Sequence, residues 1–166
     1  MSKTGASFRM DMSRLANAVS RAAGLMGESQ NLAEAVGEAL VASTRKRFKD
    51  ETDPEGNLWK ESARAESEGG QTLTETAGLK NSIVYEASPT MVVVGTNKEY
   101  AAIHQFGGEI EPQRAPKLKF QVGGKWIATK KVTMPARPFI GINEEDMAEA
   151  GETMISGMKR AFGVVS

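Results

Sequence analysis

The sequence contains a single histidine, His104, so any serine–histidine hydrolase mechanism would have to use it. Its neighbours in the segment 100–108 are alanine, isoleucine, glutamine and phenylalanine, which are typical packing and hydrogen-bonding residues. There is no cysteine, which excludes thiolate metal sites and cysteine nucleophiles. No phosphate-binding glycine loop, HExxH motif or EF-hand spacing occurs. We therefore expect a structural role for His104, and a chain that is not an enzyme and uses no metal or cofactor.

A group of candidate binding residues lies in the segment 112–133, where Phe120 and Trp126 are interleaved with six basic residues. Such residues can grip a phosphate backbone and stack on bases, or they can meet the acidic surface of another protein subunit. Because much of the remaining chain is acidic, we favour subunit contact and keep nucleic-acid binding as the alternative. The contact residues that the sequence proposes are Arg114, Lys117, Lys119, Phe120, Lys125, Trp126, Lys130 and Lys131.

Charge is strongly segregated although the formal net charge is zero. Residues 51–111 carry four basic and eleven acidic side chains, whereas residues 112–140 carry seven basic and none acidic. Residues 141–166 are again acidic, with five acidic and two basic side chains. This pattern predicts complementary surfaces, either within the fold or between copies of the chain.

Residues 1–10 read as a flexible arm before a single domain at 11–166. Apolar spacing predicts two N-terminal helices. Their apolar positions are Met12, Leu15, Val19 and Ala22 in the first, and Leu32, Val36 and Leu40 in the second. The basic triplet 45–47 reads as a solvated helix end, and the small polar residues 62–71 read as a mobile linker.

The central part of the chain predicts a small antiparallel sheet. The runs 83–85 and 91–95 form a hairpin around Pro89, and short helices at 73–83, with Thr76 as N-cap, and at 100–106 flank it. Alternation in 117–122 and 125–128 predicts a protruding hairpin within 109–133.

The C-terminal helix is the best-defined element of the sequence. Asn143 is a suitable N-cap, three acidic residues follow it, and Gly163 stands at a C-cap position. Its apolar stripe comprises Met147, Ala150, Met154, Met158 and Phe162. The predicted fold is therefore α+β: a small antiparallel sheet with two N-terminal helices, a short central helix and a C-terminal helix packed on it, plus a protruding basic β-hairpin.

Several short motifs occur in a fixed order along residues 30–160, and together they resemble the virion morphogenesis, or tail completion, family of tailed phages such as Mu-like phages. The residues that carry the resemblance are Trp59, Gly78, Tyr100, His104, Gln105, Phe106, Gly107, Pro135, Arg137, Pro138 and Phe139.

The resemblance implies a non-enzymatic structural protein of the head–tail junction, located in the virion neck or tail top after assembly in the host cytoplasm. The implied partners are further copies of the chain in a ring, with six copies expected, the adjoining head–tail connector, and tail terminator or tail tube proteins. Contact with genomic DNA in the ring lumen is a further expectation, and no membrane is involved. We also expect the segments 100–108 and 135–141 to lie beside each other, with Arg137 paired to a carboxylate or a helix end.

Overall fold

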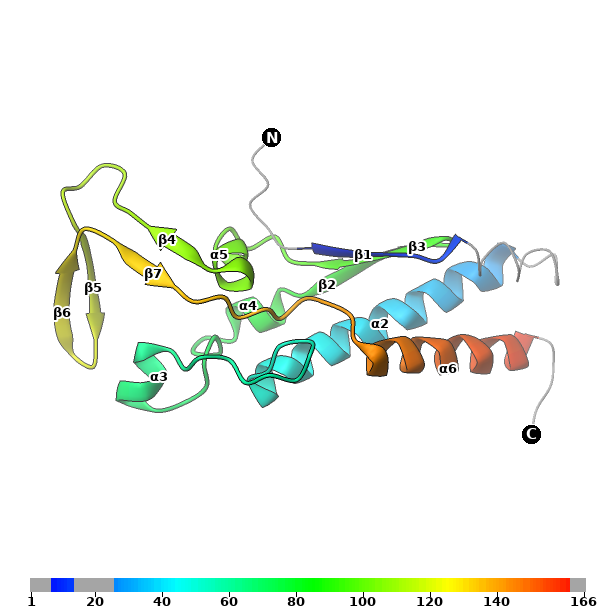
Figure 1. Ribbon diagram of the computed structural model, residues 1–166. Helices are drawn as coiled ribbons and strands as arrows, with labels where there is room; N and C mark the ends of the chain where they lie inside the picture. Colours follow the sequence, from blue (N-terminus) through cyan, green and yellow to red (C-terminus); the bar gives the residue numbers. More distant parts are fainter. Residues whose placement is uncertain (1–6, 14–25, 162–166) are drawn as a thin grey trace.

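The computed structural model describes residues 7–13 and 26–161 and has the predicted α+β architecture. One long helix, α2 (Met26–Asp50), runs along the molecule between a three-stranded sheet and the C-terminal helix α6 (Glu144–Ala161) (Figure 1). Apart from Met12 and Ser13, the first predicted helix lies outside the described residues.

The sheet consists of β1 (Ser7–Asp11), β2 (Val84–Ser88) and β3 (Met91–Gly95), in the antiparallel order β1-β3-β2. The predicted β2–β3 hairpin is confirmed. The prediction of a flexible arm is wrong for residues 7–10, because β1 pairs with β3 along its whole length. Its Ser-Phe-Arg-Met-Asp sequence alternates polar and apolar residues, which is a strand signal that the arm prediction overlooked.

Helix α2 buries Val36, Leu40 and Phe48 in the core. Gly37 brings the sheet close, since a Cβ there would lie 2.3 Å from the Tyr85 ring. At the end of the helix, Arg47 is buried, so the prediction of a solvated basic triplet is wrong at this position. Arg47 faces α6, where it bonds to Asp146.

The segment predicted to be a mobile linker contains a short helix, α3 (Ala63–Glu68). The Ser62 hydroxyl caps it by accepting a hydrogen bond from the Ala65 amide at 3.2 Å, and Ala65 is buried. The next helix, α4 (Gly78–Asn81), is shorter than predicted. Its N-cap is Ala77, in a left-handed conformation, rather than Thr76.

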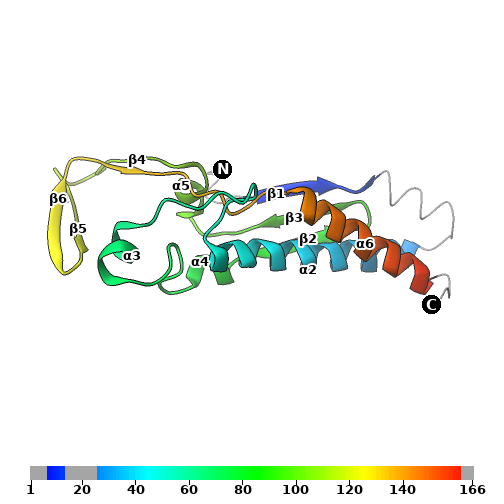
Figure 2. The same cartoon turned by 60° about the horizontal axis from the view of Figure 1, so that its bottom comes forward.

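After α5 (Ala101–Phe106), a ribbon of β4 (Gly108–Ile110) and β7 (Val132–Met134) leads to the hairpin of β5 (Leu118–Val122) and β6 (Lys125–Thr129). Gly123 and Gly124 form its turn with positive φ, as a tight hairpin requires. Figures 1 and 2 both place this hairpin at the end of the molecule opposite the C-terminal end of α6.

Helix α6 begins as predicted, because the Asn143 side chain accepts a hydrogen bond from the Asp146 amide at 2.8 Å. Its buried face comprises Asp146, Ala150, Met154 and Gly157. Met147 was predicted to be in the apolar stripe but is 55% exposed, because Asp146 bonds to Arg47 and occupies the inward-facing position. Phe162 and Gly163 lie outside the described residues. No helix among the described residues is long and apolar enough to span a membrane.

Candidate functional site

The segments 100–108 and 135–141 contact each other through the buried side chain of Gln105. Its Oε1 accepts hydrogen bonds from the backbone amides of Phe139 and Ile140, each at 3.0 Å, and its Nε2 donates to the Ile140 carbonyl at 2.8 Å. The Arg137 amide also donates to the His104 carbonyl at 2.7 Å. The expectation that segments 100–108 and 135–141 lie beside each other is thus confirmed.

Gly107 ends α5 at the closest point of this contact. Its φ of 69° is in the left-handed region, and a Cβ would lie 2.7 Å from the Ala136 nitrogen and 2.9 Å from the Met134 carbonyl oxygen. Any side chain there would therefore be strained and would also collide with backbone.

Arg137 joins the same segment to the chain after Trp59. Its Nε donates to the Lys60 carbonyl at 2.6 Å and its Nη2 to the Glu61 carbonyl at 3.1 Å. These partners are backbone oxygens of a connecting segment, so the predicted carboxylate or helix-end partner is wrong. Burial lowers the pKa of Arg137, which nevertheless remains a cation at neutral pH.

Trp59 and Phe139 anchor this region in the hydrophobic core. The Trp59 indole donates to the Pro138 carbonyl at 2.9 Å and packs edge-on against Phe48, with ring centroids 5.5 Å apart. Phe139 is fully buried and also packs against Phe48, with ring centroids 5.1 Å apart. Among the motif residues, Trp59, Gln105, Gly107, Arg137, Pro138 and Phe139 therefore form one joint, which fixes where β4 and β7 leave the core.

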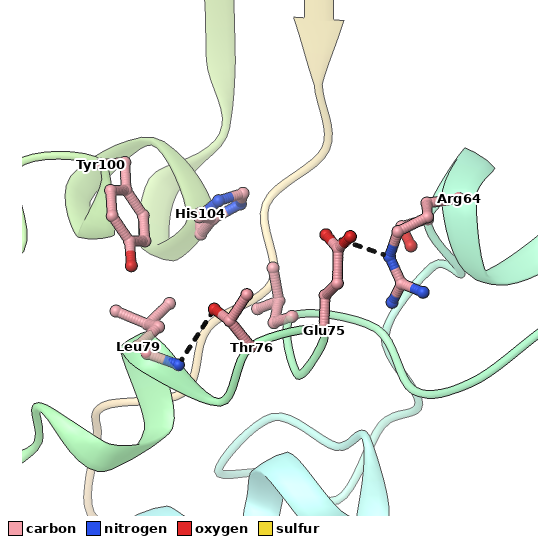
Figure 3. A pocket seen from close by; sticks show the side chains of 9 residues that line it. Arg64, Glu75, Thr76, Leu79, Tyr100 and His104 are labelled. Carbon is pink, nitrogen blue, oxygen red and sulfur yellow. Dashed lines mark hydrogen bonds and ion pairs between the residues drawn. The ribbon is translucent and has the colours of Figure 1, made fainter. Parts of the chain in front are cut away.

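Tyr100, His104 and Gly78 line a separate hollow of about 320 Å³, together with Arg64 and Glu75 (Figure 3). Tyr100 stands edge-on to the imidazole, with ring centroids 6.0 Å apart. Phe106 is largely exposed, and Pro135 is half-buried in the chain that follows β7.

The His104 environment lacks the partners that a catalytic base needs. Burial lowers the pKa of His104, and the nearby Arg137 charge lowers it further, so the ring is neutral at pH 7. Its buried Nδ1 has no hydrogen-bond partner within the described residues. Ser62 lines the same hollow, but its hydroxyl caps α3 and makes no hydrogen bond to the imidazole in this part of the chain. A nucleophile activated by a base therefore does not arise from this geometry.

The basic residues predicted to make contacts are exposed on and beside the β5–β6 hairpin, but they do not form a single surface. Cross-strand neighbours share a face, so Lys119 and Trp126 lie on one face, and Phe120 and Lys125 lie on the other. Trp126 is 75% exposed. Arg114, Lys117 and Lys130 are also exposed, close to the ends of the strands.

Lys131 differs from the other lysines because it is already paired within the chain. Its Nζ lies 2.6 Å from the Glu109 carboxylate, across the β4–β7 ribbon. It stabilises the base of the hairpin and is less available to a partner. At the tip, the Gly123 amide donates to the Glu68 carboxylate at 3.1 Å, which ties the hairpin to α3.

The sequence did not reveal the contact between Arg47 and Asp146. These residues are 99 positions apart, and each has an ordinary explanation by itself, as a basic helix end or an acidic first turn. The signal that could have predicted the pair is that Arg47 and Asp146 carry opposite charges and occupy inward-facing positions of their helices.

Comparison with known proteins identifies the chain's relatives. It is 38% identical over 80 residues to "Mu-like prophage FluMu G protein 2" of Haemophilus influenzae, covering 48% of this chain and 46% of that protein. The match thus spans less than half of that relative's length. It is 29% identical over 134 residues to "Putative capsid assembly protein G" of Escherichia phage Mu, covering 74% of this chain and 76% of the relative.

No solved structure matches the chain. One protein-family model matches residues 10–159, a range that includes the Gln105 joint and the β5–β6 hairpin. The chain belongs to the phage virion morphogenesis family.

Proposed function

We propose that this chain is a structural protein of the phage head–tail junction, where copies of it form a closed ring that completes the neck or tail so that head and tail can join. Membership of the virion morphogenesis family supports an assembly role. The relative in phage Mu is described as a putative capsid assembly protein, which agrees with such a role.

The observation that carries the proposal is the exposed basic hairpin on a chain whose remaining residues carry a net negative charge. Lys117, Lys119, Lys125 and Lys130 are exposed and form no ion pair in the described part of the chain. A basic projection and an acidic body on the same molecule favour contact between different surfaces of identical subunits. Such a heterologous contact produces a ring when the rotation closes.

In this proposal the ring has six copies and lies between the head–tail connector and the tail terminator or tail tube. The hairpin contacts acidic surface on the next subunit or on an adjoining ring. The Gln105 joint has a supporting role, because it fixes the direction in which the β4–β7 ribbon carries the hairpin.

Electron microscopy of lysates from a phage with an early stop codon in this gene tests the proposal. Filled heads beside unattached tails are expected, and expression of the intact chain from a plasmid should restore joined particles. Normal joined particles without the protein would contradict a junction role.

A nucleic-acid-binding module is the second candidate, favoured by the exposure of Trp126 beside Lys119 on one hairpin face. It predicts that the purified chain binds duplex DNA with an affinity that falls steeply between 50 and about 200 mM salt. It also predicts that changing the hairpin lysines removes this binding. Failure to bind DNA at low salt would exclude this candidate.

A further inference from the structure

One exposed face of α6 combines an apolar side chain with carboxylates that form no ion pair within the described residues. Ile155 is 51% exposed and follows Glu152 by three positions, so the two are neighbours on the helix surface. The exposed carboxylates of this helix, none of which forms an ion pair within the described residues, are Glu144, Glu145, Glu149 and Glu152. Glu145, Glu149 and Glu152 recur at positions i, i+4 and i+7, so they form one acidic ridge along the helix.

One face of the β5–β6 hairpin has the opposite character. Its central residues are Lys119, Gln121, Trp126 and Ala128, because Lys119 pairs with Ala128 and Gln121 with Trp126. Lys117 and Lys130 are exposed directly beyond the paired strands, two residues from Lys119 and Ala128 respectively. This face therefore places one exposed tryptophan diagonally opposite Lys119, with two further cations beyond the open end of the strands.

The residues of the two surfaces are spaced on a similar scale. Lys119 and the Gln121–Trp126 pair are two residues apart along the hairpin, which is about 6.6 Å on extended strands. On α6, Glu152 and Ile155 are three residues apart, which is about 4.5 Å along the helix axis. Lys119 can thus meet Glu152 while Trp126 covers Ile155.

The positions of the surfaces prevent them from meeting within one molecule. The hairpin lies at one end of the fold, and the whole of α6 lies in the other half of the molecule (Figures 1 and 2). Each copy therefore offers one basic and one acidic surface, which is the requirement for a repeating head-to-tail contact.

From this complementarity we infer that the α6 face with Glu149, Glu152 and Ile155 receives the Trp126 face of the β5–β6 hairpin of a second copy. The inference rests on the proposed ring and identifies the two surfaces that build it. The hairpin is the projecting part, and the α6 face is its docking site on the next subunit.

Charge reversal in the purified full chain tests the contact by analytical ultracentrifugation over a range of protein concentrations. We expect the wild type to self-associate at about 150 mM salt. Lys117→Glu/Lys119→Glu/Lys130→Glu and, separately, Glu145→Lys/Glu149→Lys/Glu152→Lys should each leave only monomer. A chain carrying all six changes should assemble again, because the charges are exchanged and remain complementary. The matched control, Lys49→Glu/Lys60→Glu/Lys98→Glu, should assemble normally, and circular dichroism should show that every variant is folded.

Cross-linking gives a second measurement that does not depend on charge. The natural chain has no cysteine, so Lys119→Cys/Glu149→Cys introduces the only two thiols. A short bismaleimide should then produce a ladder of covalent multimers that ends at the number of copies in the ring. Lys119→Cys alone and Glu149→Cys alone should remain monomeric on a denaturing gel.

Three results would overturn the inference. Assembly that persists in both reversed variants would show that copies meet through other surfaces, and would leave the proposed ring intact. Dimers from either single-cysteine variant would show a symmetric contact instead of a head-to-tail one. A wild type that remains monomeric at every concentration would contradict the self-contact itself, while the stop-codon phage would still decide the junction role.

Discussion

Arg47 of α2 and Asp146 of α6 form an ion pair in which the side chains are only 6% and 2% exposed. Arg47 also donates to the carbonyls of Phe139 and Gly141, at 3.2 and 3.0 Å. Asp146 accepts a hydrogen bond from the Asn143 amide at 3.0 Å. The pair thus joins the long helix, the end of the Pro135–Gly141 segment and the start of α6.

Replacing Arg47 by methionine should destabilise the protein by about 3–5 kcal/mol, because it leaves the Asp146 carboxylate buried without its cation. Urea unfolding followed by circular dichroism measures this loss. Lys46→Met is a matched control on the same helix, since the Lys46–Asp50 pair is largely exposed and should contribute less than about 1 kcal/mol. Equal losses of unfolding free energy in the two variants would show that burial does not increase the contribution of the Arg47–Asp146 pair to stability.

Gly107→Ala should cost more than the strain of a left-handed backbone alone, which is about 1–3 kcal/mol. The added Cβ would also lie within 3 Å of the Ala136 nitrogen and the Met134 carbonyl oxygen. Gly56→Ala isolates the two effects, because Gly56 also has a positive φ but a Cβ there would meet nothing within 4 Å. We expect thermal unfolding to show a clearly larger loss at Gly107. If the two glycines tolerate alanine equally, the close contact at the joint is wrong.

Gln105→Leu should destabilise the fold by about 3 kcal/mol, because it keeps the volume but leaves two backbone amides and a carbonyl without their partner. Chemical denaturation gives the loss. Gln113→Leu is the control at an exposed glutamine and should change stability by less than about 0.5 kcal/mol. A Gln105→Leu protein as stable as the control would remove Gln105 from its role in the joint.

His104 should titrate below its ordinary pKa of 6.5, because burial and then the Arg137 charge disfavour the imidazolium. A folded state that binds the proton more weakly than the unfolded chain loses stability when that proton binds. The stabilising contribution is therefore complete above about pH 6.5 and declines as the pH falls toward the lowered pKa of the folded state.

The single histidine makes this titration simple to follow, since its ring protons give the only imidazole signals in an NMR spectrum. The midpoint should lie below 6.5 in the native protein and near 6.5 in urea. His104→Gln should lose less thermal stability than the wild type between pH 7 and pH 5. A native midpoint at or above 6.5 would contradict the buried, cation-facing environment.

Replacing His104 also tests the expectation that the protein is not an enzyme. His104→Ala phage should form plaques at the wild-type frequency at a permissive temperature, because no nucleophile among the described residues is hydrogen-bonded to the imidazole. A complete loss of infectivity with a folded protein and joined particles would indicate a chemical role.

The elements whose signals are local could be predicted from the order of the amino acids. The β2–β3 hairpin follows from apolar runs around Pro89, α5 ends where Gly107 permits a left-handed backbone, and Asn143 begins α6. The order of the short motifs also indicated the family, which the match over residues 10–159 confirms.

The long-range partners of these elements depend on how the helices and strands pack, which local patterns do not reveal. Arg47 reads as a solvated helix end until α6 packs against it, and Arg137 takes two backbone carbonyls rather than a carboxylate. β1 needs β3 as a partner, because an isolated alternating segment cannot satisfy its own backbone hydrogen bonds. In the hairpin, side chains alternate between two faces along each strand, and the pairing register fixes which residues of β5 and β6 share a face. This register places Lys119 and Lys125 on opposite faces, which the composition of the segment does not reveal.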